Sequence, residues 1–311
     1  MPVRPLSLLE KAPVQGVLSA LLFLSSLWAP PLGFLLCTVS PLPMAVASWR
    51  GGARSGVVAL VVGAAAAWAG SGGEAALMYA LYFGVGGAAL GLAMRLEKGA
   101  EVVLGSYAAL SVAAFGGLLL VEAVRTGVGP TALIAASMKQ SVLQMKQLLL
   151  SAQAGPEATA AMEAWAGRFA RVFPGALAAL SLLAGWINGL ALRRIAARTG
   201  SELPRWNTWR APEGWIWLLI ASGLLAVLGS GWPATLGLNL FIPLVAVYFL
   251  QGLAVLQHLF ETKAFPPALR GAAYLFLVLQ FPAALLVAGV GAFDLWLDFR
   301  ARWSSGAPTS S

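Results

Sequence analysis

Apolar residues run along this sequence in long stretches that contain no acidic or basic residue. An Asp, Lys or Arg at the centre of a membrane helix costs about 2.5–3.5 kcal/mol, so stretches free of charge mark helices that cross a bilayer. The stretches cover residues 12–49, 55–73, 75–94, 102–121, 172–192, 214–260 and 271–293. The pattern therefore predicts a multi-pass membrane protein built from helices.

Two of these stretches, 12–49 and 214–260, are too long for one crossing, because about 20 residues span the hydrocarbon core. Each contains a helix breaker at a suitable place, Pro30 with Pro31 in the first and the segment 229–233 in the second. The chain should fold back at these points. We therefore expect an all-α, polytopic integral membrane helix bundle of about 8–9 transmembrane helices, with eight if the short segment 214–228 does not cross completely.

Residues 126–173 interrupt the series of spans with an amphipathic pattern. Apolar side chains recur at helical spacing between 131 and 151, and a second stripe follows Pro156, a favourable first residue of a helix. The two stripes are Ile134, Met138, Val142, Met145 and Leu149, then Met162, Trp165, Phe169 and Phe173. This segment predicts an amphipathic helical hairpin that rests on the membrane, caps a cavity or docks a partner.

The interruption divides the chain into predicted parts. Residues 1–125 form an N-terminal membrane bundle, 126–173 the interfacial hairpin, 174–303 a C-terminal membrane bundle and 304–311 a disordered tail. Basic residues near the span ends favour a cytoplasmic N-terminus, since Lys and Arg accumulate in the loops on that side. An odd number of spans then leaves Arg300 outside and an even number brings it in, so its side stays open.

Composition agrees with a membrane protein and narrows its function. The chain is 59% hydrophobic and only 10% charged, with a mean hydropathy of +0.80, whereas about a quarter of the residues of soluble domains are charged. The net charge of +8 is spread over short loops. Such loops lie beside anionic lipid headgroups and control topology, so we expect membrane lipids as neighbours and no nucleic acid.

No arrangement of residues in the sequence indicates catalysis. It has no HExxH, P-loop or GxSxG motif. The single cysteine, Cys37, and the single histidine, His258, do not provide the ligand set of a metal site. We therefore expect no enzymatic activity, no metal and no other cofactor.

Uncharged polar residues inside the apolar stretches are the candidates for a ligand site. They either line a polar cavity or hydrogen-bond between helices. The candidates are Asn188, Asn239, Tyr248 and Gln251.

Small residues at the start of the first apolar stretch form a candidate docking face. Ala12, Gly16 and Ala20 are spaced four apart, which places them on one side of a helix and lets another helix approach closely. The approaching helix belongs either to the same chain or to a partner.

Three segments of the sequence carry a resemblance to a known family. They are RWNTWRAPEGW at 205–215, YFLQGLAVL at 248–256 and GAFDLWLDFR at 291–300, the last with the signature residues Gly291, Asp294, Trp296, Asp298 and Arg300. These segments resemble the YybS-like bacterial membrane proteins, a family of unknown function. The resemblance implies a multi-pass protein of the bacterial inner (cytoplasmic) membrane.

That family is in turn similar to the S components of energy-coupling-factor transporters, which capture vitamins or metals. This similarity implies a subunit that binds or transports a small molecule, together with an ATPase and its membrane coupling subunit. In S components a small-residue face on the first helix docks onto the energising module, and Ala12, Gly16 and Ala20 match that face. The alternative function is a non-catalytic membrane scaffold or assembly factor, with protein partners docked on the segment 126–173.

The C-terminal signature places two acidic residues near the end of the last span. Asp298 has a basic residue, Arg302, four positions further on, which is the favourable order for a helical ion pair. Asp294 lies deeper in the apolar stretch, where a charge is costly. It therefore either pairs with a basic residue from another helix or carries a proton.

Overall fold

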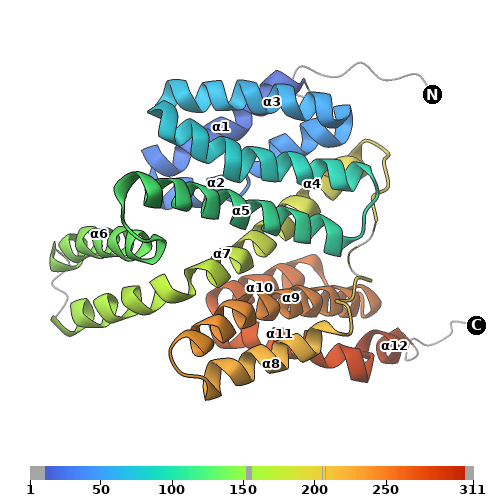
Figure 1. Cartoon of the computed structure of the whole chain (residues 1–311). Helices are drawn as coiled ribbons and strands as arrows, with labels where there is room; N and C mark the ends of the chain where they lie inside the picture. Colours follow the sequence, from blue (N-terminus) through green and yellow to red (C-terminus); the bar gives the residue numbers. More distant parts are fainter. Residues whose placement is uncertain (1–10, 152–155, 205, 207, 305–311) are drawn as a thin grey trace, which may run out of the picture.

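The computed structural model describes residues 11–151, 156–204, 206 and 208–304, and this part of the chain contains helices and no strand (Figure 1). The predicted all-α class is confirmed. The helices are α1 (Ala12–Trp28), α2 (Pro30–Cys37), α3 (Pro41–Met78), the π-helix η2 (Tyr79–Gly84), α4 (Val85–Arg95), α5 (Ala100–Thr126), α6 (Pro130–Ser151), α7 (Pro156–Arg198), α8 (Trp215–Leu228), α9 (Trp232–Thr262), α10 (Pro267–Leu279), α11 (Phe281–Leu297) and α12 (Phe299–Ser304).

Several helices are long and apolar enough to cross a membrane. By length and composition the described residues contain 4 such helices, at Leu32–Arg95, Ala100–Thr126, Arg168–Arg198 and Trp232–Thr262. A bent pair formed by α10 and α11 raises the number to 5 if it counts as one span. The first of these helices is 64 residues long, so it is more than one crossing in length. The count of 8–9 spans stays a prediction.

Glycines and prolines mark the breaks between helices, two of them at the reversals that the sequence predicts. Inside α3 the backbone leaves the helical conformation at Gly52 (φ 70°) and Gly72 (φ 84°). Positive φ values suit glycine because it has no Cβ atom. Gly52 lies between the first two apolar stretches of the sequence, and Gly72 lies near the end of the second. Pro30 begins α2 directly after α1, and Gly231 (φ 62°) precedes α9.

The small-residue face of α1 packs against α3 of the same chain. Gly16 is buried, and a Cβ atom added there would lie 2.2 Å from the carbonyl oxygen of Ala59. Ala20 is fully buried and Ala12 is half-buried. The hydroxyl of Tyr79 donates to the carbonyl of Gly16 at 3.4 Å. The helix that approaches this face is therefore α3 of the same chain.

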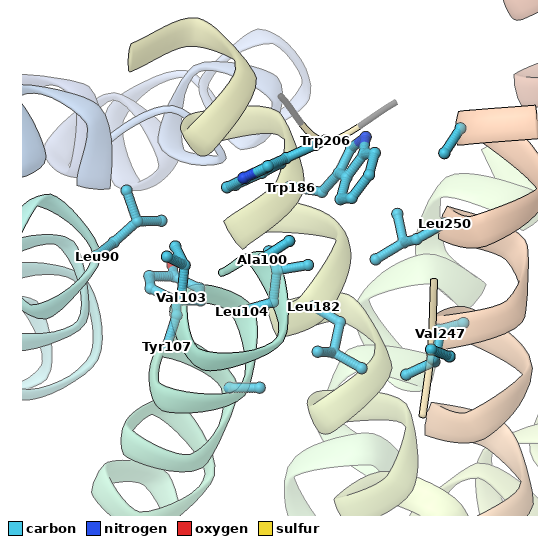
Figure 2. Packing of buried hydrophobic residues seen from close by; sticks show 14 of the residues in the cluster. Leu90, Ala100, Val103, Leu104, Tyr107, Leu182, Trp186, Trp206, Val247 and Leu250 are labelled. Carbon is cyan, nitrogen blue, oxygen red and sulfur yellow. The ribbon is translucent and has the colours of Figure 1, made fainter. Parts of the chain in front are cut away.

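The core of the bundle gathers around α7 (Figure 2). Leu104 and Tyr107 of α5 belong to one cluster of buried residues with Trp186 of α7 and with Val247 and Leu250 of α9. Figure 2 shows α7 between α5 and α9. This central helix thus joins the N-terminal helices to the C-terminal ones through a shared apolar core.

The predicted hairpin consists of α6 and the first part of α7, which lie side by side at one end of the bundle (Figure 1). The second helix crosses the predicted boundary at 173/174 without a break and ends at Arg198. Ile134 is buried, and Phe173 stacks on Phe115 of α5 with ring centroids 5.0 Å apart. The side chains outside the described part are those of Val142, Met145, Leu149, Met162 and Trp165.

Candidate functional site

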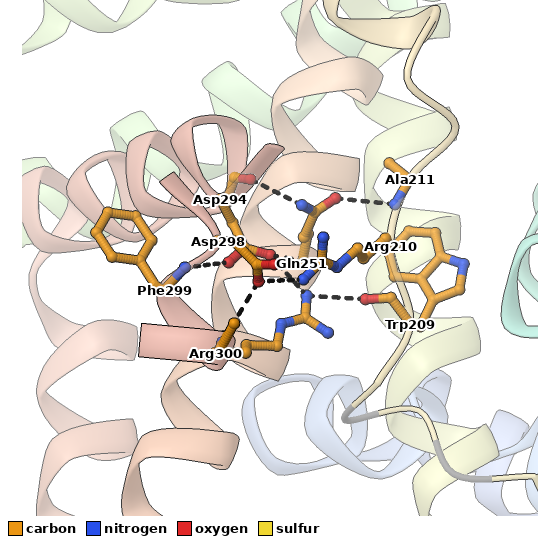
Figure 3. A network of polar contacts seen from close by, with 10 residues as sticks. Trp209, Arg210, Ala211, Gln251, Asp294, Asp298, Phe299 and Arg300 are labelled. Carbon is orange, nitrogen blue, oxygen red and sulfur yellow. Dashed lines mark hydrogen bonds and ion pairs between the residues drawn. The ribbon is translucent and has the colours of Figure 1, made fainter. Parts of the chain in front are cut away.

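Three segments that are far apart in the sequence, one of them in α9, meet at one place (Figure 3). They are the loop 199–214 between α7 and α8, the part of α9 around Gln251, and the chain from the end of α11 into α12. These are the segments that carry the family resemblance. We call the contacts among them the polar cluster. Its members are Arg210, Ala211, Gln251, Asp294, Asp298 and Arg300.

Tryptophans hold the loop 199–214 against α7. Trp206 is only 2% exposed and lies against Trp186, with ring centroids 5.1 Å apart. A Cβ atom added at Gly189 would lie 2.1 Å from the Trp206 ring, so glycine leaves the room that the indole occupies. The loop therefore runs back along α7, and its polar backbone enters the apolar bundle.

Gln251 provides hydrogen bonds to this irregular backbone. Its side-chain oxygen accepts from the N–H of Ala211 at 2.9 Å, and its side-chain nitrogen donates to the carbonyl of Gly291 at 2.9 Å. The residue is 1% exposed. Irregular backbone at membrane depth needs such partners because the bilayer core offers no water. Gln251 thus joins the loop, α9 and α11 at one point.

Glycines bring α9 and α11 into direct backbone contact at the same place. A Cβ atom added at Gly252 would lie 2.0 Å from the carbonyl oxygen of Val287, and one added at Gly291 would lie 2.0 Å from that of Tyr248. As the residue numbers fall along α9 they rise along α11, so the two helices are antiparallel. Small residues permit this close packing in membrane bundles.

A buried ion pair lies next to this contact. Asp294 is 0% exposed, and its Oδ2 is 3.1 Å from Nη2 of Arg300 and 4.0 Å from Nε of Arg210. Oδ1 accepts from the N–H of Phe299 at 3.1 Å. Nη2 of Arg300 also donates to the carbonyl of Trp209 at 2.9 Å. Of the two roles considered for Asp294, these contacts support the structural ion pair.

Asp298 forms the outer part of the cluster. It ends α11 in the left-handed conformation (φ 42°), and its carbonyl accepts from the N–H of Arg302 in α12 at 3.2 Å, so these two residues keep their helical spacing. The carboxylate of Asp298 pairs with Arg210. The hydrogen bond from Arg210 lowers the pKa of Asp298, whereas burial lowers the pKa of Arg300 against the opposing effect of Asp294.

The cluster also locates the end of α11 relative to the loops. Arg300 binds Trp209 of the loop 199–214, and the indole N–H of Trp209 donates to Glu101 at the start of α5 at 3.0 Å. Arg300 therefore lies at the same end of the bundle as the loop 199–214 and the start of α5. The side of the membrane on which this end lies stays a prediction.

A hollow of about 380 Å³ lies beside the polar cluster. It is open at the surface, between the start of α8 and the end of α11. Its lining residues are Glu213, Gly214, Ile216, Trp217, Leu295 and Trp296. Glu213 belongs to the quoted segment at 205–215 and Trp296 to the one at 291–300, while Trp217 lies outside the quoted segments.

The helix α8 that borders the hollow is too short for a crossing. It has 14 residues, which at 1.5 Å per residue makes it ~21 Å long, against about 30 Å for the hydrocarbon core. Gly237 of α9 packs against Ser222, and Gly223 packs against Phe241. The antiparallel order places the first residue of α8 beside the middle of α9, and the hollow lies at this level.

The uncharged polar residues proposed as ligand contacts are not brought together. Asn188 donates to the carbonyls of Thr38 and Ala184, which ties α7 to the end of α2. Gln251 belongs to the polar cluster. Tyr248 is 2% exposed, and its hydroxyl has no hydrogen-bond partner in the described part of the chain. Their role in ligand binding stays a prediction.

Asn239 has a local role at the proline of α7. Its side-chain oxygen accepts from the N–H of Gly175 at 2.7 Å, and its nitrogen donates to the carbonyl of Arg171 at 2.9 Å. A regular helix would join these two backbone groups directly, but Pro174 lies between them and disturbs the helix. The side-chain amide of α9 is therefore inserted between them and ties α9 to α7.

Replacing Asn239 with leucine should destabilise the chain by about 1 kcal/mol, the size typical of polar contacts between membrane helices. The N–H of Gly175 and the carbonyl of Arg171 would lose their partner. The measurement is the thermal midpoint in a fixed detergent, with Gln257→Leu as the control because the Gln257 amide bonds only Glu261 of its own helix among the contacts described here. Equal shifts for both variants would contradict the bridging role.

The sequence was compared with known families, curated proteins and solved structures. The model of the family described as "Predicted membrane protein (DUF2232)" matches residues 17–295. The chain belongs to this family. The matched range of the DUF2232 model contains Gln251, Gly291 and Asp294 and stops before Asp298. No curated protein and no solved structure matches.

Proposed function

We propose that this DUF2232 member is a non-catalytic membrane subunit that binds or transports a small molecule in the manner of S components of energy-coupling-factor transporters. The observation that carries the proposal is the hollow at the ends of α8 and α11. Membrane transporters commonly build substrate sites where discontinuous helices end part-way through the bilayer. The start of the short α8 provides such an end at the hollow, and the bend between α10 and α11, whose axes differ by 106°, provides another at the far end of α11.

The polar cluster adds to this proposal because it supplies polar groups next to the hollow. The side chains of Arg210 and Asp298 are 42% and 46% exposed, whereas Asp294 is fully buried. The buried pair fixes the end of α11, and the outer pair remains within reach of a ligand. The proposed ligand contacts are thus centred on the hollow, in addition to the uncharged residues suggested by the sequence.

The partner of such a subunit is proposed to be an ATPase with its membrane coupling subunit, in a bacterial inner membrane. Ala12, Gly16 and Ala20 remain its proposed docking face, and because α3 packs against Gly16, docking there would require α1 to move away from α3. A bulky residue at Gly16 would separate α1 from α3. If such a variant lost its partner, the loss would therefore reflect either misfolding or failure to dock.

The alternative function is a membrane scaffold or assembly factor. The hairpin of α6 and the first part of α7 favours it, because this element stands at one end of the bundle (Figure 1). Among the described side chains of α6, the apolar Leu143 is 50% exposed. A protein partner or the membrane surface would cover such a helix.

The two functions are separated by purification from native membranes in mild detergent, with mass spectrometry of retained proteins and small molecules. Binding or transport predicts a small molecule that is lost in Trp296→Ala and kept in Trp68→Ala, since Trp68 is 65% exposed on α3 and lies outside the hollow. The scaffold predicts protein partners that are lost when Met138 and Met145 are both changed to Glu. Retention of the small molecule in Trp296→Ala would contradict the proposed site.

A further inference from the structure

The lining of the hollow combines one carboxylate with two indole rings. Glu213 lies just before α8, Trp217 follows within its first turn, and Trp296 reaches the hollow from α11. Trp217 is 67% exposed and Trp296 is 55% exposed. Their rings are therefore accessible, and both can contact a molecule that enters the space beside Glu213.

The charge of Glu213 is not neutralised by the basic residues that the structure describes nearby. Among the residues that the structure describes, its carboxylate has no ion-pair partner, while Arg210 is paired with Asp298 and Arg300 with Asp294. The polar cluster carries two basic and two acidic side chains that engage one another. Glu213 thus leaves a negative charge at the wall of the hollow.

Carboxylates and aromatic faces both attract positive charge. The faces of tryptophan rings bind ammonium groups through their negative quadrupole, and this is the usual recognition of quaternary ammonium ligands. A negative side chain in the same wall adds Coulomb attraction, which is stronger at a partly buried surface than in bulk water. An anion placed here would instead face the unneutralised carboxylate of Glu213.

We propose that this hollow binds an organic cation, a protonated amine or quaternary ammonium group, with Glu213 as its counter-ion and Trp217 and Trp296 against its apolar parts. The inference rests on the proposed function, since it names the ligand class of the same site. The volume of about 380 Å³ is within the usual range of small-molecule pockets, roughly 300–1,000 Å³. The ammonium group belongs either to a soluble amine or to a lipid headgroup.

The test uses the full chain in lipid nanodiscs. Binding of radiolabelled choline and ethanolamine is measured in nanodiscs of phosphatidylglycerol alone. Retention of phosphatidylethanolamine is measured by native mass spectrometry in mixed nanodiscs. We expect at least one of these ligands to bind, and Glu213→Gln to weaken its binding about tenfold, a loss equivalent to about 1.4 kcal/mol. Binding in the soluble arm alone identifies a free amine, and binding in the lipid arm alone identifies a headgroup.

Matched variants separate this inference from a general loss of structure. Trp296→Leu should weaken binding and Trp68→Leu should leave it unchanged, because both are exposed membrane tryptophans and only the first lines the hollow. Failure of every amine probe to bind, or equal binding to the parent chain and to Glu213→Gln, overturns the inference. If native purification then still retains a neutral or anionic molecule that depends on Trp296, the proposed function stands and only the ligand class is wrong.

Discussion

Replacing Asp294 with alanine is expected to lower the free energy of unfolding by about 3–5 kcal/mol, the cost of removing one partner from a buried ion pair. The change would leave the guanidinium of Arg300 buried without its carboxylate and remove the acceptor of the Phe299 N–H. The measurement is the loss of thermal stability in a fixed detergent, followed by tryptophan fluorescence. Arg300→Met should have a comparable effect, because it leaves the carboxylate of Asp294 buried. The remaining cation, Arg210, is then at the longer distance of 4.0 Å.

Two controls make this expectation specific. Glu122→Gln breaks an exposed pair with Arg125 on α5 and should leave the thermal midpoint nearly unchanged. The double variant Asp294→Leu with Arg300→Met should be less damaging than either single change, since it leaves no buried charge without a partner. A midpoint for Asp294→Ala equal to that of Glu122→Gln would show that the pair does not stabilise the fold.

Gly291→Ala is expected to destabilise the chain by about 1–3 kcal/mol or more, as overpacking of a tight contact does. The added Cβ atom would lie 2.0 Å from the carbonyl oxygen of Tyr248 and 2.6 Å from the nitrogen of Gly252. Since both are backbone atoms, α11 has to move away from α9. That movement would also weaken the hydrogen bond from Gln251 to the carbonyl of residue 291.

Gly289 provides a matched control on the same helix. An added Cβ atom there meets nothing within 4 Å, so Gly289→Ala should be neutral or stabilise the helix by up to about 1 kcal/mol. The two variants have the same chemistry and differ only in their surroundings. The thermal midpoint and the cross-linking yield between cysteines placed on α9 and α11 are the measurements. Equal results for the two alanines would contradict the close contact of these helices.

Much of the fold was predictable because its signals are local. The charge-free stretches predict the helical membrane class, but the breaks with positive φ at Gly52 and Gly72 were not singled out among the many glycines of the chain. By contrast, the breaks before Pro30 and around Gly231 were visible, since proline and glycine act on the backbone of their own residue. The second helix of the hairpin was predicted, but its continuation past Pro174 was not, because Asn239 of α9 bridges the disturbed turn.

The polar cluster was only partly predictable because its contacts are non-local. All three of its segments were recognised in the sequence, and an ion pair with a basic residue was one of the two roles considered for Asp294. The sequence did not identify Arg300 or Arg210 as that basic residue. Asp298 was assigned to Arg302 by helical spacing, and its pair with Arg210 of the loop 199–214 is a non-local contact that no spacing indicates. Neighbouring Pro212 was the available signal that Arg210 lies in a loop and not on a helix. The hollow depends on where α8 begins relative to α11, which no local pattern encodes.

Trp209 constrains the motions open to this molecule. Its indole donates to Glu101 at the start of α5, while its carbonyl accepts from Arg300 beyond α11. A single residue thus connects α5, which precedes the central helix α7, with the segment that follows α11. In a transport cycle of the rocking type, in which the halves of a bundle rotate as rigid bodies, the pivot would have to lie at Trp209, or one of these two bonds would have to break and re-form in each cycle.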